Sequence, residues 1–259
     1  MTRRRLDREL VRRGLAPSRS AARRAIEASR VVVVGTPTPT PATLVAPDVP
    51  VRIEDGPGWA SRAGEKLAGA LDAFDVDPAG LRVLDVGAST GGFTDVLLRA
   101  GAASVVAVDV GYGQMITRLA TDDRVTVVDR TNVRTADLDA LGAPFDLVVA
   151  DLSFISIALV AAQLARAGRD GTGYVVLVKP QFEVGRERVG RGGIVRDPDA
   201  HADAVASVAD ALEQAGIAPV AVAPSPIDGS RGNREFLLHG LHGGARRVTT
   251  TDIDGLVAP

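Results

Sequence analysis

The sequence predicts an α/β protein, a doubly wound and mostly parallel sheet that follows a small, basic α+β unit. From residue 82 onward, short apolar runs alternate with helical stretches, which is typical of a sheet covered by helices on both faces. Residues 1–30 carry ten arginines against three acidic residues, although the whole chain has a net charge of −2. A basic segment of this kind predicts an anionic partner.

Composition narrows the class of protein. With 259 residues, 46% of them hydrophobic, the chain can form a sizeable core, and no apolar run reaches the roughly 18 residues that a membrane span requires. The first residues lack the apolar centre of a secretion signal. The absence of cysteine excludes disulfides and thiolate zinc sites, and three histidines leave little for a metal cluster. We therefore expect a cytoplasmic protein with no membrane partner and no metal.

The N-terminal elements follow from spacing and from turn residues. Apolar residues at helical spacing predict one helix that stops at Gly14 and a second that opens at Pro17 and presents arginines on one side. Residues 31–34 and 51–53 are typical of short strands, and four prolines within 36–47 favour an extended loop or a sheet edge. The sequence therefore predicts two helices beside a small sheet.

A hinge separates this unit from the rest of the chain. Residues 56–58, Gly-Pro-Gly, combine the two residue types that most strongly interrupt regular structure. We therefore expect a small domain at 1–55, an interdomain linker at 56–63 and a large domain at 64–259.

The large domain alternates strands with helices. The expected strands are 82–87, 104–110, 124–129, 145–151 and 174–179, with two more at 220–223 and 235–239. The expected helices are 93–100, 112–121, 137–141, 155–169 and 198–215. Nothing after Gly240 predicts an element. This order predicts a doubly wound sheet whose ligand binds at the carboxyl ends of the strands.

A glycine-rich turn follows the first of these strands. In LDVGASTGGF the acidic residue and the glycines are Asp85, Gly87, Gly91 and Gly92. Glycines here let the backbone approach a ligand, and their spacing differs from the G-x-G-x-x-G of dinucleotide-binding turns. Asp109, at the end of the next strand, is placed to bind a ribose diol. The turn predicts S-adenosyl-L-methionine as the ligand, with a purely structural turn as the alternative.

Only two lysines occur in a chain that otherwise uses arginine as its cation. Lys179 and Asp151 end strands of the predicted sheet. Lys66 begins a helix and Glu235 begins the last strand, so both can meet the first pair at one edge. Unlike arginine, a lysine can act as a base where burial and a second ammonium lower its pKa. The four residues predict a proton-handling set, and two ordinary salt bridges are the alternative.

These residues carry a resemblance to a known family. The residues that match the K-D-K-E tetrad of the FtsJ-like ribose 2′-O-methyltransferases, in order and context, are Lys66, Asp151, Lys179 and Glu235. The blocks DVGASTGGFTDVLL and LVKPQFEVG more closely resemble the TlyA, or hemolysin A, family of rRNA 2′-O-methyltransferases. Residues 6–35 resemble the S4 RNA-binding domain of that family. The resemblance covers nearly the whole chain.

The resemblance implies a fold, a cofactor and a reaction. It implies an N-terminal α+β S4 domain, followed in the chain by a Rossmann-like class I methyltransferase domain with a seven-stranded, mostly parallel sheet. The residues that would line the S-adenosylmethionine pocket are Gly87, Ser89, Gly91, Gly92, Phe93, Asp109 and Asp129. The implied reaction is 2′-O-methylation of a cytidine in 16S rRNA, 23S rRNA or both, with Lys179 as the base or its positioning group. The implied partner is a ribosomal subunit, and a monomer is expected.

Arginines are the expected RNA contacts, mainly to phosphates. Those of the S4-like segment are Arg3, Arg4, Arg5, Arg19, Arg23 and Arg30, and those beside the expected cleft are Arg62, Arg186, Arg188 and Arg191. The alternative for any such group is a solvated charged face. Among the few aromatic residues, Tyr112, Phe154 and Phe182 are available for base stacking but are more often core residues.

Several questions stay open. The family's interdomain R-A-W-V tetrapeptide is Pro57-Gly58-Trp59-Ala60 here, so linker control of cofactor binding stays open. After the fourth strand, Asp151-Leu152-Ser153-Phe154 stands where enzymes that methylate a base nitrogen carry an N-P-P-Y-like motif, which favours an oxygen acceptor. The alternatives are a non-catalytic ribosome assembly factor and, from the family's historical name alone, a membrane-lytic protein.

Overall fold

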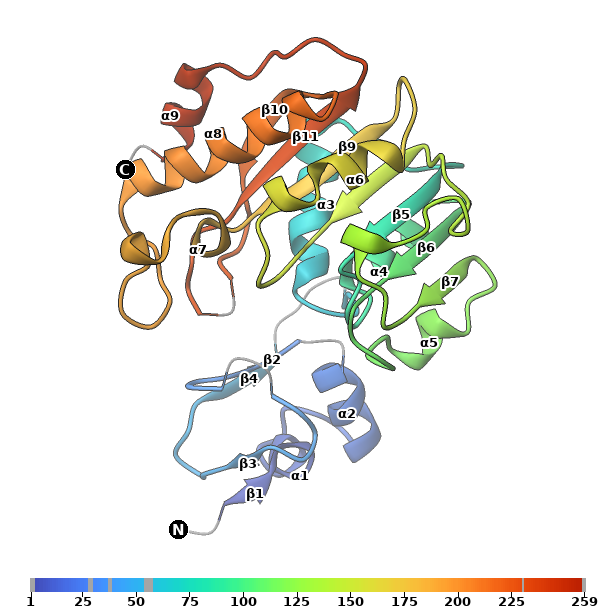
Figure 1. Cartoon of the computed structure of the whole chain (residues 1–259). Coiled ribbons are helices and arrows are strands. Elements are labelled where there is room, and N and C mark those ends of the chain that lie inside the picture. Colours follow the sequence, from blue (N-terminus) through green and yellow to red (C-terminus); the bar gives the residue numbers. More distant parts are fainter. Residues whose placement is uncertain (1–2, 28–29, 37–38, 54–57, 230, 258–259) are drawn as a thin grey trace. The chain divides into compact units, whose positions relative to one another are not determined.

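The structure, a computed structural model, describes residues 3–27, 30–36, 39–53, 58–229 and 231–257 (Figure 1). The chain divides into two compact units, Met1–Gly64 and Glu65–Pro259. Of the expected linker, Gly56 and Pro57 lie outside the described residues. Among the described residues, no helix is long and apolar enough to cross a membrane.

The small unit combines short helices with two two-stranded sheets. Its elements are β1 (Arg4–Arg5), α1 (Leu6–Arg12), α2 (Arg19–Glu27), β2 (Val31–Val33), β3 (Leu44–Val45) and β4 (Val51–Ile53). β2 pairs with β4 and β1 with β3, all antiparallel. The two predicted helices and the predicted strands are present. The pairing of Arg4–Arg5 with Leu44–Val45 was not expected, because two residues carry no periodicity.

The core of the small unit joins both helices to the strands. Buried apolar residues from α1, α2, β2 and β3 form one cluster: Leu6, Leu10, Ala22, Ala25, Ile26, Val31, Val33 and Val45. Each fully buried leucine in it contributes about 1.5–3 kcal/mol relative to an exposed one. The helices are short, so this shared cluster rather than helix propensity stabilises them.

Two buried carboxylates form hydrogen-bonded ion pairs with four arginines of the small unit. Asp7 accepts hydrogen bonds from Arg5 Nε at 3.2 Å and from Arg19 Nη2 at 2.9 Å. The Arg5 hydrogen bond is the largest cause that lowers the pKa of Asp7 to about 2. Glu9 is held in the same way by Arg12 and Arg13. Asp7 thus ties β1 and α1 to the beginning of α2.

The large unit is built on a seven-stranded sheet of order β10-β11-β9-β8-β5-β6-β7. The strands are β5 (Arg82–Val86), β6 (Ser104–Val108), β7 (Val125–Val128), β8 (Leu147–Ala150), β9 (Gly173–Val178), β10 (Ile217–Pro224) and β11 (Phe236–His242). β5 to β9 pair in parallel, whereas β11 is antiparallel to both β9 and β10. The predicted α/β fold class with a mostly parallel sheet is confirmed.

Helices surround this sheet. They are α3 (Ala63–Phe74), α4 (Gly92–Arg99), α5 (Thr117–Ala120), α6 (Ala161–Arg166), α7 (Pro180–Glu183), α8 (Pro198–Gln214) and α9 (Thr250–Val257), with 3₁₀ turns η1 (Val133–Thr135), η2 (Ile157–Leu159) and η3 (Arg186–Arg188). One face of the sheet packs into a single apolar cluster with residues of α6, α8 and α9 (Figure 1). The segment β8, LVVA, is buried at every position, as a central parallel strand should be.

Three helix predictions need correction, and the helices α7 and α9 were not predicted. Residues 137–141 form turns instead of a helix, because five residues gain too few hydrogen bonds to offset helix nucleation. The helix expected at 112–121 is limited to α5, after a loop that contains Gly113 at φ +62°. The segment 155–169 is split into η2 and α6, and α9 was missed because its apolar residues are few.

Candidate active site

The site lies where parallel strands end. The loops after β5, β6, β8 and β9 begin at the carboxyl edge of the sheet, where ligands of doubly wound folds bind. β11 runs in the opposite direction, so its first residues lie at this same edge. Phe236 is paired with Val178, which places Glu235 beside Lys179. The antiparallel strand thus brings an acidic residue from the end of the chain to the lysine that follows β9.

The four tetrad residues form two ion pairs. Lys66 Nζ, from α3, is bonded to Glu235 Oε2, and Lys179 Nζ lies 2.5 Å from Asp151 Oδ1. Both lysines are only 8% exposed. The sequence analysis placed these residues at one edge of the sheet, and the structure joins them as two ion pairs. Asp151, Lys179 and Glu235 lie at the ends of the adjacent strands β8, β9 and β11, and Lys66 comes from α3. Their roles in catalysis stay a prediction.

Lys179 is oriented by two groups of the loop after β8. Its ammonium donates a hydrogen bond to Ser153 Oγ at 3.0 Å. The contact with Asp151 Oδ1 is an ion pair without hydrogen-bond alignment, because that oxygen accepts no hydrogen bond from any described residue. A cation held by an acid and a hydroxyl at the edge of a sheet can position an oxygen nucleophile or exchange a proton with it.

The turn after β5 requires glycine at two positions. Gly87 has a φ of +87°, and a Cβ there would lie 2.4 Å from the backbone oxygen of Asp151. Gly91 has a φ of +95°, and a Cβ there would lie 2.4 Å from Leu119 Cδ1 on α5. Both side-chain positions are closed by neighbouring elements, so the turn is packed between the loop after β8 and α5. This packing brings the glycine turn beside the Lys179 and Asp151 pair.

Asp85 is a buried carboxyl with an unused oxygen. Its Oδ2 accepts a hydrogen bond from Thr94 Oγ1 at 2.6 Å, whereas its Oδ1 has no partner among the described residues. Burial raises the pKa of Asp85 to about 7. An orphaned acceptor beneath the glycine turn is an observation that fits a ligand with a donor group.

Carboxylates also organise the loops after β6 and β7. Asp109 accepts hydrogen bonds from the backbone N–H of Ser89 at 2.8 Å and of Gly111 at 2.6 Å. Asp129 accepts one from Gly113 N at 2.8 Å. A carboxylate has about four acceptor sites, so both acids retain capacity for hydroxyl or amino donors of a nucleoside. With Asp85, this set of acceptors fits the hydroxyl and amino donors of S-adenosylmethionine.

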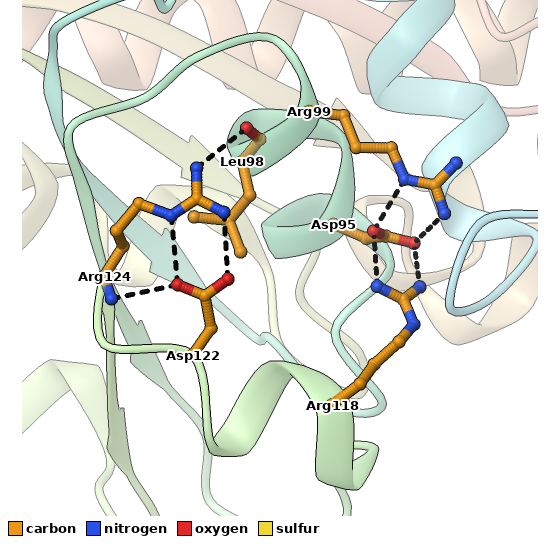
Figure 2. A network of polar contacts seen from close by, with 6 residues as sticks. All are labelled: Asp95, Leu98, Arg99, Arg118, Asp122 and Arg124. Carbon is orange, nitrogen blue, oxygen red and sulfur yellow. Dashed lines mark hydrogen bonds and ion pairs between the residues drawn. The ribbon is translucent and has the colours of Figure 1, made fainter.

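A salt-bridge network links α5 to α4, the helix that follows the glycine turn (Figure 2). Asp95, on α4, is 1% exposed and forms ion pairs with Arg99 of the same helix and with Arg118 of α5. The Nη1 atom of Arg118 lies 2.8 Å from Asp95 Oδ1. Nearby, Arg124 pairs with Asp122 and donates to the carbonyl of Leu98. Sequence reasoning missed this network. Its only signal was the acidic residue inside the block DVGASTGGFTDVLL.

An exposed aromatic ring, that of Phe154, comes directly after Ser153, which accepts the hydrogen bond of Lys179. Phe154 is 88% exposed at a positive φ of +66°, and its ring centroid is 5.3 Å from that of Phe182. Glu183 fastens the same loop, since it accepts hydrogen bonds from Ser156 Oγ at 2.6 Å and from Ile157 N at 3.0 Å. Tyr112 is also exposed. The expectation that these aromatics are more often core residues is therefore wrong for Phe154 and Tyr112.

The arginines expected to contact RNA differ in their surroundings. Those whose side chains are exposed are Arg3, Arg4, Arg19, Arg23, Arg62, Arg186 and Arg191, while Arg5, Arg30 and Arg188 are half-buried. Arg5 and Arg19 are bonded to Asp7, and Arg188 is paired with Asp197 at 3.2 Å and with Asp203. Their contacts with RNA stay a prediction.

The fold and this edge together define a class of protein. The sheet has one antiparallel strand, a glycine turn follows its first strand, and acids follow the next two strands. Together these features fit an S-adenosylmethionine-dependent methyltransferase. A family model described as FtsJ-like methyltransferase matches residues 59–241, and an S4 domain model matches residues 4–48. The chain belongs to the FtsJ-like methyltransferase family and carries an S4 domain ahead of the methyltransferase domain.

Individual relatives agree with this assignment. The 16S/23S rRNA (cytidine-2′-O)-methyltransferase TlyA of Mycobacterium tuberculosis is 49% identical over 236 residues, which cover 90% of this chain and 88% of that protein. Hemolysin A of Brachyspira hyodysenteriae is 35% identical over 91% of this chain and 98% of its own length. A solved structure of a hemolysin-named protein from Streptococcus thermophilus aligns with a TM-score of 0.78 at 35% identity, covering 99% of this chain and 95% of that one. The predicted family resemblance is confirmed.

Proposed function

We propose that this protein transfers a methyl group from S-adenosylmethionine to the ribose 2′-hydroxyl of a cytidine in 16S rRNA, 23S rRNA or both. The observation that carries the proposal is the pair of buried lysine–carboxylate contacts at the edge of the sheet, beside the glycine turn. The name of the Mycobacterium tuberculosis relative supports the substrate and the acceptor oxygen.

The glycine turn and three acids would hold the cofactor. S-adenosylmethionine supplies a methyl group that its positive sulfur already activates. Gly87, Ser89, Gly91, Gly92 and Phe93 form the turn and the start of α4. Asp109 has acceptor capacity for the ribose hydroxyls, and Asp129 has it for a donor of the base. Asp85 offers its unpartnered oxygen to a donor of the ligand.

Lys179 would act on the 2′-hydroxyl. Its Nζ is kept in place by Asp151 and Ser153, so the approaching oxygen meets a fixed group. In the unprotonated state Lys179 accepts the hydroxyl proton, and as an ammonium it positions the oxygen. Lys66 and Glu235 form a second ion pair, which is buried, and Glu235 lies beside Lys179. Since the two opposite charges of this pair balance, it adds no net charge next to Lys179.

RNA binding would use both units. In the S4 domain, the exposed arginines contact phosphates, which gives affinity without sequence choice. A ribose inside a stacked helix cannot easily reach Lys179, so the target nucleotide leaves its stack. Phe154, exposed and fixed beside the lysine, is suited to stack on the released base. Arg62 of the small unit, and Arg186 and Arg188 of η3, would contact further phosphates of the RNA.

Methyl transfer to unmodified ribosomal subunits tests the proposal. Labelled S-adenosylmethionine is incubated with 30S and 50S subunits that lack the modification, and label in either subunit supports the proposal. The rival, an assembly factor without catalysis, is expected to bind subunits but to show no cofactor binding by calorimetry. A membrane-lytic protein is expected to release dye from liposomes. We expect a cytoplasmic enzyme that is monomeric, and sedimentation of the free protein checks the oligomeric state.

A further inference from the structure

A polar cavity is lined by residues of the loop that leads to Glu235. It has a volume of about 520 Å³ and lies between the loop that precedes α8 and the loop that joins β10 to β11. The lining residues that matter for its chemistry are Arg196, Arg231, Arg234, Ser225, Asp228 and His201. Three arginines face one acidic residue, so the cavity is basic.

The cavity has preformed walls. Asn233, 3% exposed, accepts a hydrogen bond from Val195 N at 3.0 Å and donates one to the carbonyl of Gly193 at 2.9 Å. The Gly190 N–H donates to the carbonyl of Ile194 at 3.0 Å, which closes a glycine-rich turn. A buried amide therefore fixes the turn against the β10–β11 loop, and no large rearrangement is needed before a ligand enters.

Two arginines at the cavity are available for an anion. Arg196 and Arg231 are exposed, and neither makes an ion pair with another described residue. Their guanidinium nitrogens lie along the glycine turn, 3.7 Å and 3.6 Å from where a Cβ of Gly190 and of Gly193 would stand. Arg234 is committed elsewhere, since it donates to the carbonyl of Leu256 and lies over the Phe236 ring. Two guanidinium forks without carboxylate partners match the oxygens of a phosphate.

The loop of the cavity also carries an active-site residue. Glu235 follows Arg231 by four positions, and a Cβ on Gly229 would lie 2.5 Å from Glu235 Oε1. The cavity and the Lys66–Glu235 pair therefore share one loop. We propose that the cavity binds a phosphodiester group of the RNA strand that presents the target ribose. This inference rests on the proposed function, because it assigns the neighbouring backbone contact to the same substrate.

The test removes the two arginines together. The double variant Arg196→Ala/Arg231→Ala is compared with Arg166→Ala, an exposed arginine on α6 that bonds only to Gln163 among the described residues. Binding to 30S and 50S subunits is measured from 50 to 200 mM salt, with calorimetry of S-adenosylmethionine as the folding and cofactor control. We expect the slope of log affinity against log salt to fall by about two in the double variant, since each phosphate contact contributes about one.

Further outcomes separate this inference from the proposed function. The double variant Arg196→Lys/Arg231→Lys should recover most of the salt slope. In the double alanine variant, the KM for subunits should rise while the affinity for S-adenosylmethionine stays unchanged. A double variant with the wild-type salt slope and KM would overturn the inference. A wild-type protein that binds subunits but transfers no methyl group overturns the proposed function instead, while the salt slopes still decide whether the cavity binds RNA.

Discussion

Glu235 and Lys66 bond to each other although 169 residues separate them in the chain. Both are almost completely buried, so each charge depends on the other for solvation. Loss of one partner leaves a bare charge in the protein, whereas replacement of both by apolar residues removes the charge altogether. This asymmetry separates the structural role of the pair from its catalytic role.

The Glu235→Gln variant should lose stability. It leaves the ammonium of Lys66 buried without a carboxylate, which costs about 3–5 kcal/mol in comparable buried pairs. The double variant Lys66→Met/Glu235→Leu should regain most of that free energy of unfolding, because no unpaired charge stays buried. It should still be inactive in methyl transfer. Chemical denaturation and methyl transfer are measured on both variants. A double variant that is stable and fully active would show that the pair is only structural.

Asp85 should make stability depend on pH. Burial raises its pKa to about 7, so the folded protein holds a proton that an unfolded aspartate, with a pKa near ~3.9, releases. The stabilisation is complete below about pH 4 and is lost as the pH rises towards 7. The Asp85→Asn variant lacks this titration. As the pH rises from 4 to 7, the wild type should therefore lose free energy of unfolding relative to the variant. A pH-independent difference in urea denaturation would contradict the assignment.

At the scale of elements, α5 closes the cofactor turn and Asp95 holds α5. Arg118→Ala removes the link from α5, while Arg99→Ala removes the other arginine of the same carboxylate without touching α5 (Figure 2). Arg118 is half exposed, so we expect a loss of about 0.2–1 kcal/mol, up to roughly fivefold in the Kd for S-adenosylmethionine. Calorimetry on both variants checks this. Equal losses in the two would mean that α5 is not the element that matters.

The small unit should be acid-sensitive through Asp7. Hydrogen bonds from Arg5 and Arg19 lower its pKa to about 2, so its contribution to stability is present above about pH 4 and is lost as the pH falls towards 2. Asp7→Asn should therefore weaken hydrogen-exchange protection in α1 and α2 at pH 7. The difference from wild type should shrink as both are acidified. Protection that is equal at pH 7 would contradict this role.

At the scale of the whole molecule, sequence patterns predict the features that depend on residues close together in the chain. Strand ends, the glycine turn and the placement of Asp151 and Lys179 depend on runs of neighbouring residues, and they were predicted. The exposure of Phe154, the α5 network and the cavity at Arg196 were not. Each depends on contacts between segments far apart in the chain, which no local pattern encodes. The short strand at Arg4–Arg5 exists only because residues 44–45 lie opposite.

The two parts of the chain differ in net charge. The N-terminal segment holds an excess of positive charge, whereas the remainder is acidic overall. Non-specific attraction to RNA is therefore expected from the S4 domain, and the choice of nucleotide from the methyltransferase domain. Removal of the S4 domain arginines should reduce affinity for subunits without altering which nucleotide is modified.

One measurement tests the central claim most directly. Unmodified 30S and 50S subunits are treated with S-adenosylmethionine and either the wild-type protein or Lys179→Ala, and the nucleosides are then identified by mass spectrometry. We expect 2′-O-methylcytidine with the wild-type protein and a decrease of about 10²–10⁴-fold with the variant, whose cofactor affinity is unchanged. Near-normal formation of 2′-O-methylcytidine by Lys179→Ala, or a methyl group on a base nitrogen, would contradict the account.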